Sequence, residues 1–268
     1  MSRMHTKQTY IVTTGWWSTK DDRDDRSVKR GDGSIRSSAF HQLWYGAIKR
    51  YTHAKKVYVI DSHAPVKPSL DEQNEVMFSL LENAGHSTSH NGKLCGVSRA
   101  HLLGMSIAMV NEVDYWVYVE QDALIYGEGI VEEAIGKMKK PYMFGAGWGT
   151  PQPMQQSFMI IKTSHIPQFI KHFNAIRAKD NEISPETKFA IACSPILRCL
   201  PEFLFKNIHT KSLKNRIVWR LFRLFQGFDD LPFGYGRVRP IDFDERYFYF
   251  QHGDKEELDM YLKKSHLS

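Results

Sequence analysis

The sequence DYWVYVEQDALIYGEGI, residues 114–130, places two carboxylates, Glu120 and Asp122, directly after an apolar run. The aromatic and β-branched residues 115–119 predict a buried strand, because such side chains favour a covered sheet. Two carboxylates one residue apart at a strand end can ligate one hard divalent cation, which can in turn hold a diphosphate. The alternative is two solvated acids, or an Asp122 that only caps the next segment.

The N-terminal half alternates predicted strands and helices. Strands are expected at residues 10–14, within 55–63 with its end at Asp61, and at 115–119; helices at 37–52 behind Ser37 or Ser38, at 71–84, and at 98–110 behind Ser98. This pattern predicts an α/β fold with a mostly parallel sheet covered by helices. Ligands bind beyond the carboxyl ends of such strands, which are residues 13–15, 61–63 and 120–122.

The C-terminal half predicts a mixed-sheet extension. Residues 141–163 indicate a strand, a Gly/Pro loop and a second strand, and residues 244–262 indicate a strand, a loop at His252 and a helix. The charged stretch 18–34 shows no apolar periodicity, which is typical of a loop.

Residues 91–122, NGKLCGVSRAHLLGMSIAMVNEVDYWVYVEQD, resemble the core of nucleotide-sugar-dependent glycosyltransferases of the GT-A fold, in particular family 2-like members. The roles of the family pattern would fall to Asn91 and Gly92, Arg99 with Gly104 and Ala108, Asp114 and Tyr115, and Glu120 and Asp122. The first acid departs from the aspartate usual in the family. The resemblance implies one GT-A-like domain over 1–268, with a nucleotide-sugar-binding half (1–130) and an acceptor-binding half (131–268).

The resemblance also implies a donor and a cofactor. The cofactor would be Mn²⁺ or Mg²⁺, held by Asp122 with Glu120 and the late histidine His252 as further ligands. The donor, a UDP- or GDP-sugar, would lie against Thr13, Thr14, Gly15, Asp61, Lys93, Arg99, Glu120, Gln121 and Trp148. Lys93 and Arg99 would add positive charge beside the phosphates, or else face solvent or acidic partners. The Trp148 ring suits the apolar side of a pyranose, but it could equally belong to the core.

An inverting transfer needs a carboxylate base for the acceptor hydroxyl. Glu186 is the first candidate by comparison with inverting relatives, and Asp229 and Asp230 are reserves. Glu186 could instead be an ordinary first-turn residue stabilised by its helix dipole. A retaining course, which needs no such base, stays open.

The segment 203–225 is rich in basic residues and contains no acid. Its Lys and Arg residues are Lys206, Lys211, Lys214, Arg216, Arg220 and Arg223. A helical projection from Leu213 separates apolar from basic side chains, which is typical of a helix that lies on an anionic membrane or packs on its own domain. The acceptor would be a saccharide or lipid-linked saccharide, and we find no nucleic-acid motif.

Composition limits the remaining alternatives. The excess of 36 basic over 30 acidic residues, a net charge of +6, is mild, and the three cysteines lack zinc or CxxC spacing. The polar start and the lack of an apolar run of about 18 residues predict a cytoplasmic protein, with peripheral association at the inner face of a membrane. Two rival hypotheses are a nucleotidyltransferase, disfavoured by the lack of a Gly-rich basic signature after residues 10–14, and a non-catalytic nucleotide- or carbohydrate-binding module.

Overall fold

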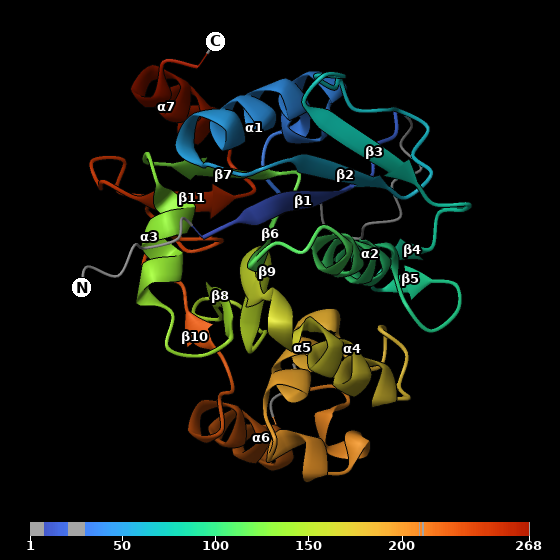
Figure 1. The fold of residues 1–268 in the computed structure, drawn as a ribbon. Coiled ribbons are helices and arrows are strands. Elements are labelled where there is room, and N and C mark those ends of the chain that lie inside the picture. Colours follow the sequence, from blue (N-terminus) through green and yellow to red (C-terminus); the bar gives the residue numbers. More distant parts are fainter. Residues whose placement is uncertain (1–7, 21–29, 209, 211, 268) are drawn as a thin grey trace, which may run out of the picture.

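The computed structural model describes residues 8–20, 30–208, 210 and 212–267. A seven-stranded sheet runs through the centre, with helices on both of its faces (Figure 1). In spatial order its strands are β10 (Asp229–Asp230), β8 (Tyr142–Ala146), β9 (Met154–Lys162), β6 (Tyr115–Val119), β1 (Tyr10–Trp16), β2 (Val57–Asp61) and β3 (Glu75–Ser79). Within this described sheet β9 alone runs against the others, so the predicted α/β class and mostly parallel sheet are confirmed.

Each face of the sheet carries its own hydrophobic core. Because successive side chains of a strand point to opposite faces, Ile11 and Trp116 enter one core while Val12 and Val117 enter the other. The first core contains α2 (Gly96–Val110), α4 (Ile166–Ala175) and α5 (Pro185–Cys193). The second contains α1 (Ser38–Tyr51), α3 (Ile130–Lys137) and α7 (Lys255–Ser265).

Two small sheets and several short helices complete the described chain. The antiparallel pairs are β7 (Ala123–Tyr126) with β11 (Phe248–Gln251) and β4 (Gly85–His86) with β5 (Ser89–His90). The remaining helices are the 3₁₀ turns η1 (Gly33–Arg36), η2 (Thr163–His165), η3 (Leu197–Cys199) and η4 (Glu202–Phe205), and the α-helix α6 (Leu213–Leu224). Residues 21–29 of the predicted charged loop lie outside the described residues.

The predicted helix at 71–84 is wrong, because this segment forms the edge strand β3. The apolar spacing of Val76, Leu80 and Leu81 suggested a helix, yet Leu81 is 98 % exposed. Strand β3 is fixed by pairing with β2 and by Glu75, whose buried carboxylate lies 2.7 Å from Nε2 of His41. These long-range contacts outweigh the local helical pattern.

The predicted helix starts are correct in one case and wrong in the other. Ser37 caps α1 by accepting a hydrogen bond from the Phe40 backbone N–H. Helix α2 begins earlier than predicted, at Gly96, with Cys95 as its N-cap, and Ser98 is buried inside the first turn. The Cys95 N–H is fixed by a hydrogen bond to the carboxylate of Asp180, a partner 85 residues away.

The basic segment forms the predicted helix α6, and one side of this helix packs on the protein's own domain. Val218 and Phe222 are buried against the domain, while Leu213, Ile217 and Leu224 are exposed. In Figure 1, α6 lies at the end of the molecule opposite α1 and α7. Among the described residues, no helix has the length and apolar character that crossing a bilayer requires.

A buried histidine should make stability depend on pH. His101 of α2 packs edge-on against Tyr118 and Phe189, and among the described residues neither of its ring nitrogens has a hydrogen-bond partner. Burial lowers the pKa of His101 to about 3. The unfolded imidazole takes up its proton near pH 6.5, so this stabilisation is complete above that pH and is lost as the pH falls toward 3.

We therefore expect the His101→Phe variant to lose less stability at acid pH than the wild type, because it has no imidazole at position 101 to be protonated on unfolding. The free energy of unfolding of the wild type, relative to the variant, should fall by about 1.4 kcal/mol per pH unit below pH 6. Denaturant titrations between pH 7 and pH 4 measure this difference. His266→Asn, at an exposed helix end, is the control and should follow the wild type; a constant difference between wild type and His101→Phe would contradict the prediction.

Candidate functional site

A cavity of about 200 Å³, here called the first cavity, opens at the carboxyl ends of β1, β2 and β6. In Figure 1 the arrows of β1 and β2 point toward the side where β4 and β5 lie. The cavity is lined by segments from these strand ends, from the N-termini of α2 and α5, and from β9 and β11. Of the residues predicted for the site, it brings together Gly15, Glu120, Gln121, Asp122 and Glu186.

The two carboxylates of the opening motif converge on one amide. The Nε2 atom of Gln251 donates to Oε2 of Glu120 at 2.5 Å and to Oδ1 of Asp122 at 3.0 Å. Pairing of β11 with β7 sets Gln251 opposite Ala123, directly beside the two acids. The two acids therefore lie within hydrogen-bond distance of a single atom, Nε2 of Gln251.

His252 contacts the other side of Asp122. Its Nε2 atom lies 3.3 Å from Oδ2 of Asp122, and its backbone N–H donates to the Asp122 carbonyl at 3.3 Å. Burial opposes ionisation of Asp122, but the hydrogen bonds and charge of His252, with Gln251, outweigh it and lower the pKa of Asp122 to about 2. Asp122 is thus an anion near neutral pH. His252 is held against it but does not line the cavity.

Arg237 extends this network. Its Nε donates to Oε1 of Gln251 at 3.2 Å, so one amide links a guanidinium to two carboxylates. The Arg237 backbone N–H donates to Oε1 of Gln155 at 3.0 Å, which anchors the arginine at the start of β9. Neither Gln251 nor Arg237 was predicted. Gln251 immediately precedes His252, and only knowledge of the β7–β11 register could have drawn attention to it.

The residue between the two acids serves a structural purpose. The Gln121 side chain accepts from the Trp17 N–H at 2.7 Å and donates to the Trp17 carbonyl at 2.9 Å, which continues the β1–β6 ladder beyond the strands. Nearby, the Tyr118 hydroxyl accepts from the Gly15 N–H at 3.3 Å. A Cβ at Gly15 would approach Ala100 to 3.2 Å, so glycine permits α2 to pack closely on β1.

Two helix N-termini face the first cavity. Gly96 and Val97 come from the first turn of α2, and Pro185 and Glu186 from the first turn of α5. Unpaired N–H groups and the helix dipole favour anions at such ends. Gln156 also lines the cavity; its Nε2 atom is buried and has no hydrogen-bond partner among the described residues.

Several predicted donor residues lie outside the first cavity. Thr13 is fully buried, and its hydroxyl accepts from Nε1 of Trp116 at 2.9 Å; Thr14 is buried as well. The Asp61 carboxylate is also buried and accepts from the Ala64 N–H, the Ser79 hydroxyl and Lys67.

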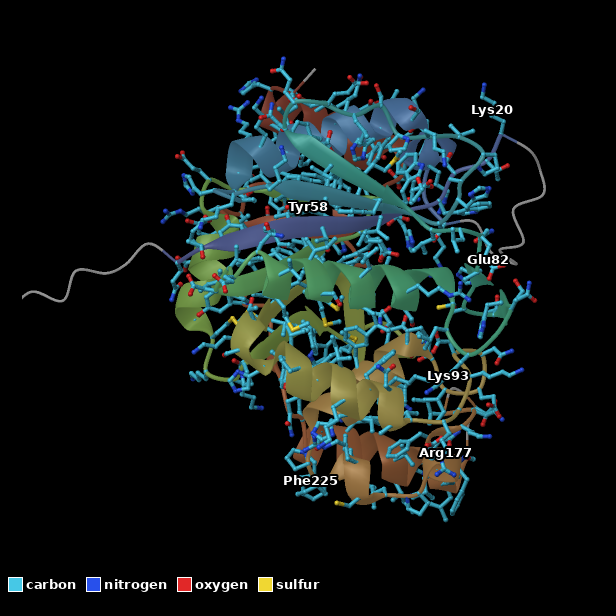
Figure 2. All side chains as sticks on the ribbon, turned by 45° about the vertical axis from the view of Figure 1, so that its right-hand side comes forward. Lys20, Tyr58, Glu82, Lys93, Arg177 and Phe225 are labelled. Atoms are coloured by element: carbon cyan, nitrogen blue, oxygen red, sulfur yellow. The ribbon has the colours of Figure 1, made fainter. Side chains whose placement is uncertain are left out.

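The two predicted phosphate-binding cations are engaged elsewhere. Lys93 donates to the carbonyl of Asn174 at 2.8 Å, and Arg99 lies 3.5 Å from the carboxylate of Glu82. In Figure 2 the labels of Lys93 and Glu82 mark the same side of the molecule, at its surface. Neither Lys93 nor Arg99 lines the first cavity.

Trp148 and Asp230 line a second cavity of about 820 Å³. It is enclosed by the 147–153 loop, α6 and the 226–230 segment, and desolvation raises the pKa of Asp230. Thr150 and Gln152 line both cavities, so the 147–153 loop lies between them. The two proposed bases, Glu186 and Asp230, therefore belong to different cavities.

The donor set fits a divalent cation only in part. Among the described residues, no group of three or more His, Cys, Asp and Glu side chains is arranged to hold a metal ion. Two carboxylates that approach one point within hydrogen-bond distance of Gln251 do suit Mg²⁺ or Mn²⁺, because such ions commonly take one or two carboxylates and complete their coordination with water and phosphate.

The comparisons with known proteins give no support for or against a metal site, so this interpretation rests on the geometry alone. No protein-family model matches the chain, and no curated protein matches it.

A buried ion pair fixes the two helix starts relative to each other. Nζ of Lys188, on α5, donates to Oδ1 of Asp180 and to the Ala178 carbonyl, each at 2.6 Å. The other oxygen of Asp180 accepts from the Cys95 N–H at the start of α2 at 2.8 Å. Lys188 and Asp180 both have fully buried side chains. This pair therefore ties α5 to α2 beside the first cavity.

We expect Lys188→Met to lower the free energy of unfolding by about 3–5 kcal/mol, because Asp180 would remain as a buried unpaired charge. Adding Asp180→Asn should recover part of this loss, since the amide keeps an acceptor for the Cys95 N–H. Denaturant unfolding measures both changes, with Lys171→Met on exposed α4 surface as the control. A loss below about 1 kcal/mol, the range of exposed ion pairs, would refute the structural role.

Proposed function

We propose that this protein is a metal-dependent glycosyltransferase that moves a sugar from a nucleoside diphosphate sugar to a saccharide or lipid-linked acceptor. The observation that carries the proposal is the convergence of Glu120 and Asp122 on one point, inside a cavity at the carboxyl ends of parallel strands. This is the edge of an α/β sheet at which ligands bind. The resemblance of residues 91–122 to GT-A enzymes supports the same conclusion.

The first cavity offers groups for each part of a nucleotide sugar. The N-termini of α2 and α5 provide positive potential for a diphosphate, and Arg237 adds a cationic group. Trp17, which is partly exposed, lines the same cavity and offers an aromatic side chain for the base or the sugar ring, whereas the Trp16 ring is buried in the core.

Glu120 and Asp122 would hold the divalent cation, with the His252 ring fixing the orientation of Asp122. When bound, such a cation neutralises charge on a departing diphosphate. Because the pKa of Asp122 is about 2, its carboxylate is ionised for this purpose throughout the physiological pH range.

In the proposed reaction, the acceptor hydroxyl oxygen forms a bond to the anomeric carbon while the bond from that carbon to the diphosphate oxygen breaks. The nucleoside diphosphate leaves with the bonding electron pair. The hydroxyl proton passes to a carboxylate, and Glu186 is the acid that lines the first cavity from α5. Asp230 lies in the other cavity, which makes Glu186 the better candidate.

Removal of the cation should weaken donor binding. We expect excess EDTA to raise the Kd of the preferred UDP- or GDP-sugar by at least about tenfold. Coordination of the diphosphate by the cation should contribute more than about 1.4 kcal/mol to the binding free energy, which corresponds to a tenfold change in Kd. Asp122→Asn should have a similar effect in Mn²⁺, whereas Asp259→Asn on exposed α7 should not. Calorimetric titration of a donor panel measures these constants.

The same titrations separate the rival functions. An affinity that is unchanged both by EDTA and by Asp122→Asn would overturn the metal-dependent donor site. Incorporation of a nucleoside triphosphate with release of diphosphate would favour a nucleotidyltransferase, and donor binding without any turnover would favour a binding module.

Glu186→Gln should lower turnover and leave donor affinity unchanged. A positioned general base contributes about 10²–10⁴-fold to the rate, so transfer to water or to an acceptor should slow by about that factor. Release of UDP or GDP gives the rate, and Glu256→Gln on the exposed surface of α7 is the matched control. An unaltered rate in Glu186→Gln would assign the base elsewhere or indicate a retaining course.

A further inference from the structure

The second cavity differs in character from the first. Its wall is largely apolar and aromatic, with Trp148, Trp219, Phe222 and Phe228 among the lining residues. It adjoins the first cavity through Thr150 and Gln152 of the intervening loop. A molecule held in the second cavity is thus next to the proposed donor, which is where an acceptor must lie.

Positive charge lines this cavity on the side formed by α6. Arg216 and Arg223 of α6 line it, and the Arg223 guanidinium lies 5.4 Å from the centre of the Trp148 ring. The segment 203–225 around them contains no acid. Asp230 is the acid that lines the cavity, and the Gln226 amide donates to it at 3.1 Å. The charge pattern therefore complements an anionic ligand at α6.

Exposed apolar side chains gather on the same part of the molecule. Trp148, Leu213 and Leu224 are 67 %, 73 % and 73 % exposed, and Phe203 and Ile217 are also exposed. In Figure 2 the label of Phe225 marks the lower end of the molecule, where α6 lies, away from α1. Apolar and basic side chains that are exposed together suit a ligand with both a hydrocarbon chain and a negative charge.

We propose that the second cavity binds an amphipathic acceptor, a lipid that carries a phosphate. Its phosphate lies against Arg216 and Arg223, its head reaches past the 147–153 loop toward the first cavity, and its chain lies along Trp148 and the exposed apolar side chains of α6. This inference names the acceptor class of the proposed transferase and rests on that function. Binding of the lipid is nevertheless measurable without any nucleotide sugar.

Decyl phosphate, below its micelle concentration, is a suitable probe. Its binding is followed by tryptophan fluorescence, since Trp148 and Trp219 line the second cavity. We expect decyl phosphate to bind at least tenfold more tightly than either decanol or inorganic phosphate, because only the complete probe engages both kinds of surface. Equal affinity for decyl phosphate and decanol, or for decyl phosphate and phosphate, would overturn the proposal.

Charge removal tests the location. The double variant Arg216→Gln/Arg223→Gln should weaken decyl phosphate binding by at least roughly tenfold, since each basic residue near an anionic surface contributes about fivefold in affinity. Lys255→Gln/Lys263→Gln, an equal charge change on exposed α7 surface, should bind like the wild type. Thermal melts confirm that both double variants fold. If both double variants bound decyl phosphate equally weakly, the attraction would be nonspecific, and the proposed site would be overturned.

Two further arms distinguish a cavity ligand from a membrane surface. Trp148→Ala should weaken binding of monomeric decyl phosphate, because that ring lies in the cavity, and should leave sedimentation with phosphatidylglycerol vesicles nearly unchanged. Loss of vesicle binding in the arginine variant without any effect of Trp148→Ala on the monomer would mean that α6 only touches the bilayer, which overturns the acceptor site. If decyl phosphate binds as expected but donor sugars do not, this site stands and the transferase proposal fails.

Discussion

The candidate site depends on the pairing of β11 with β7. This short antiparallel ladder brings residues near the end of the chain against the loop that follows β6, across about 130 positions of sequence. It sets the Gln251 amide between Glu120 and Asp122 and holds His252 on the far side of Asp122. Without it, the Gln251 amide would not offset the repulsion between these two neighbouring carboxylates.

The pattern of apolar and acidic residues along the sequence was enough to predict the central strand of the sheet and the acids at its end. The strand at 115–119 and the acids after it follow from a continuous apolar run that ends abruptly, and both are present where expected. The edge strand β3 was missed because its conformation is set by β2 and by the His41–Glu75 contact, neither of which is visible in a short window. The four-residue spacing of Val76 and Leu80 matches a helical period, but Leu80 and Leu81 lie beyond the end of β3, so this spacing joins residues of a strand and of the loop after it.

The site was predicted less completely than the fold, for a related reason. Thr13 and Asp61 do lie near strand ends, but their side chains make buried hydrogen bonds and do not reach the first cavity. Arg237 and Gln251 do reach this network, yet they come from segments whose position depends on distant pairing. The sequence pattern predicts which edge of the sheet carries the site. Which side chains face the first cavity depends on how the strands pair, that is, on their register.

The reversed direction of β9 has a consequence for how this protein could diversify. Because β9 runs against its neighbours, its first residues, and not its last, lie at the edge where the parallel strands finish. The hairpin loop that precedes β9 therefore forms a partition shared by both compartments. Insertions or substitutions in this one surface hairpin would change the shape of both cavities at once. The central sheet would stay intact, so the binding specificity could change without a loss of the fold.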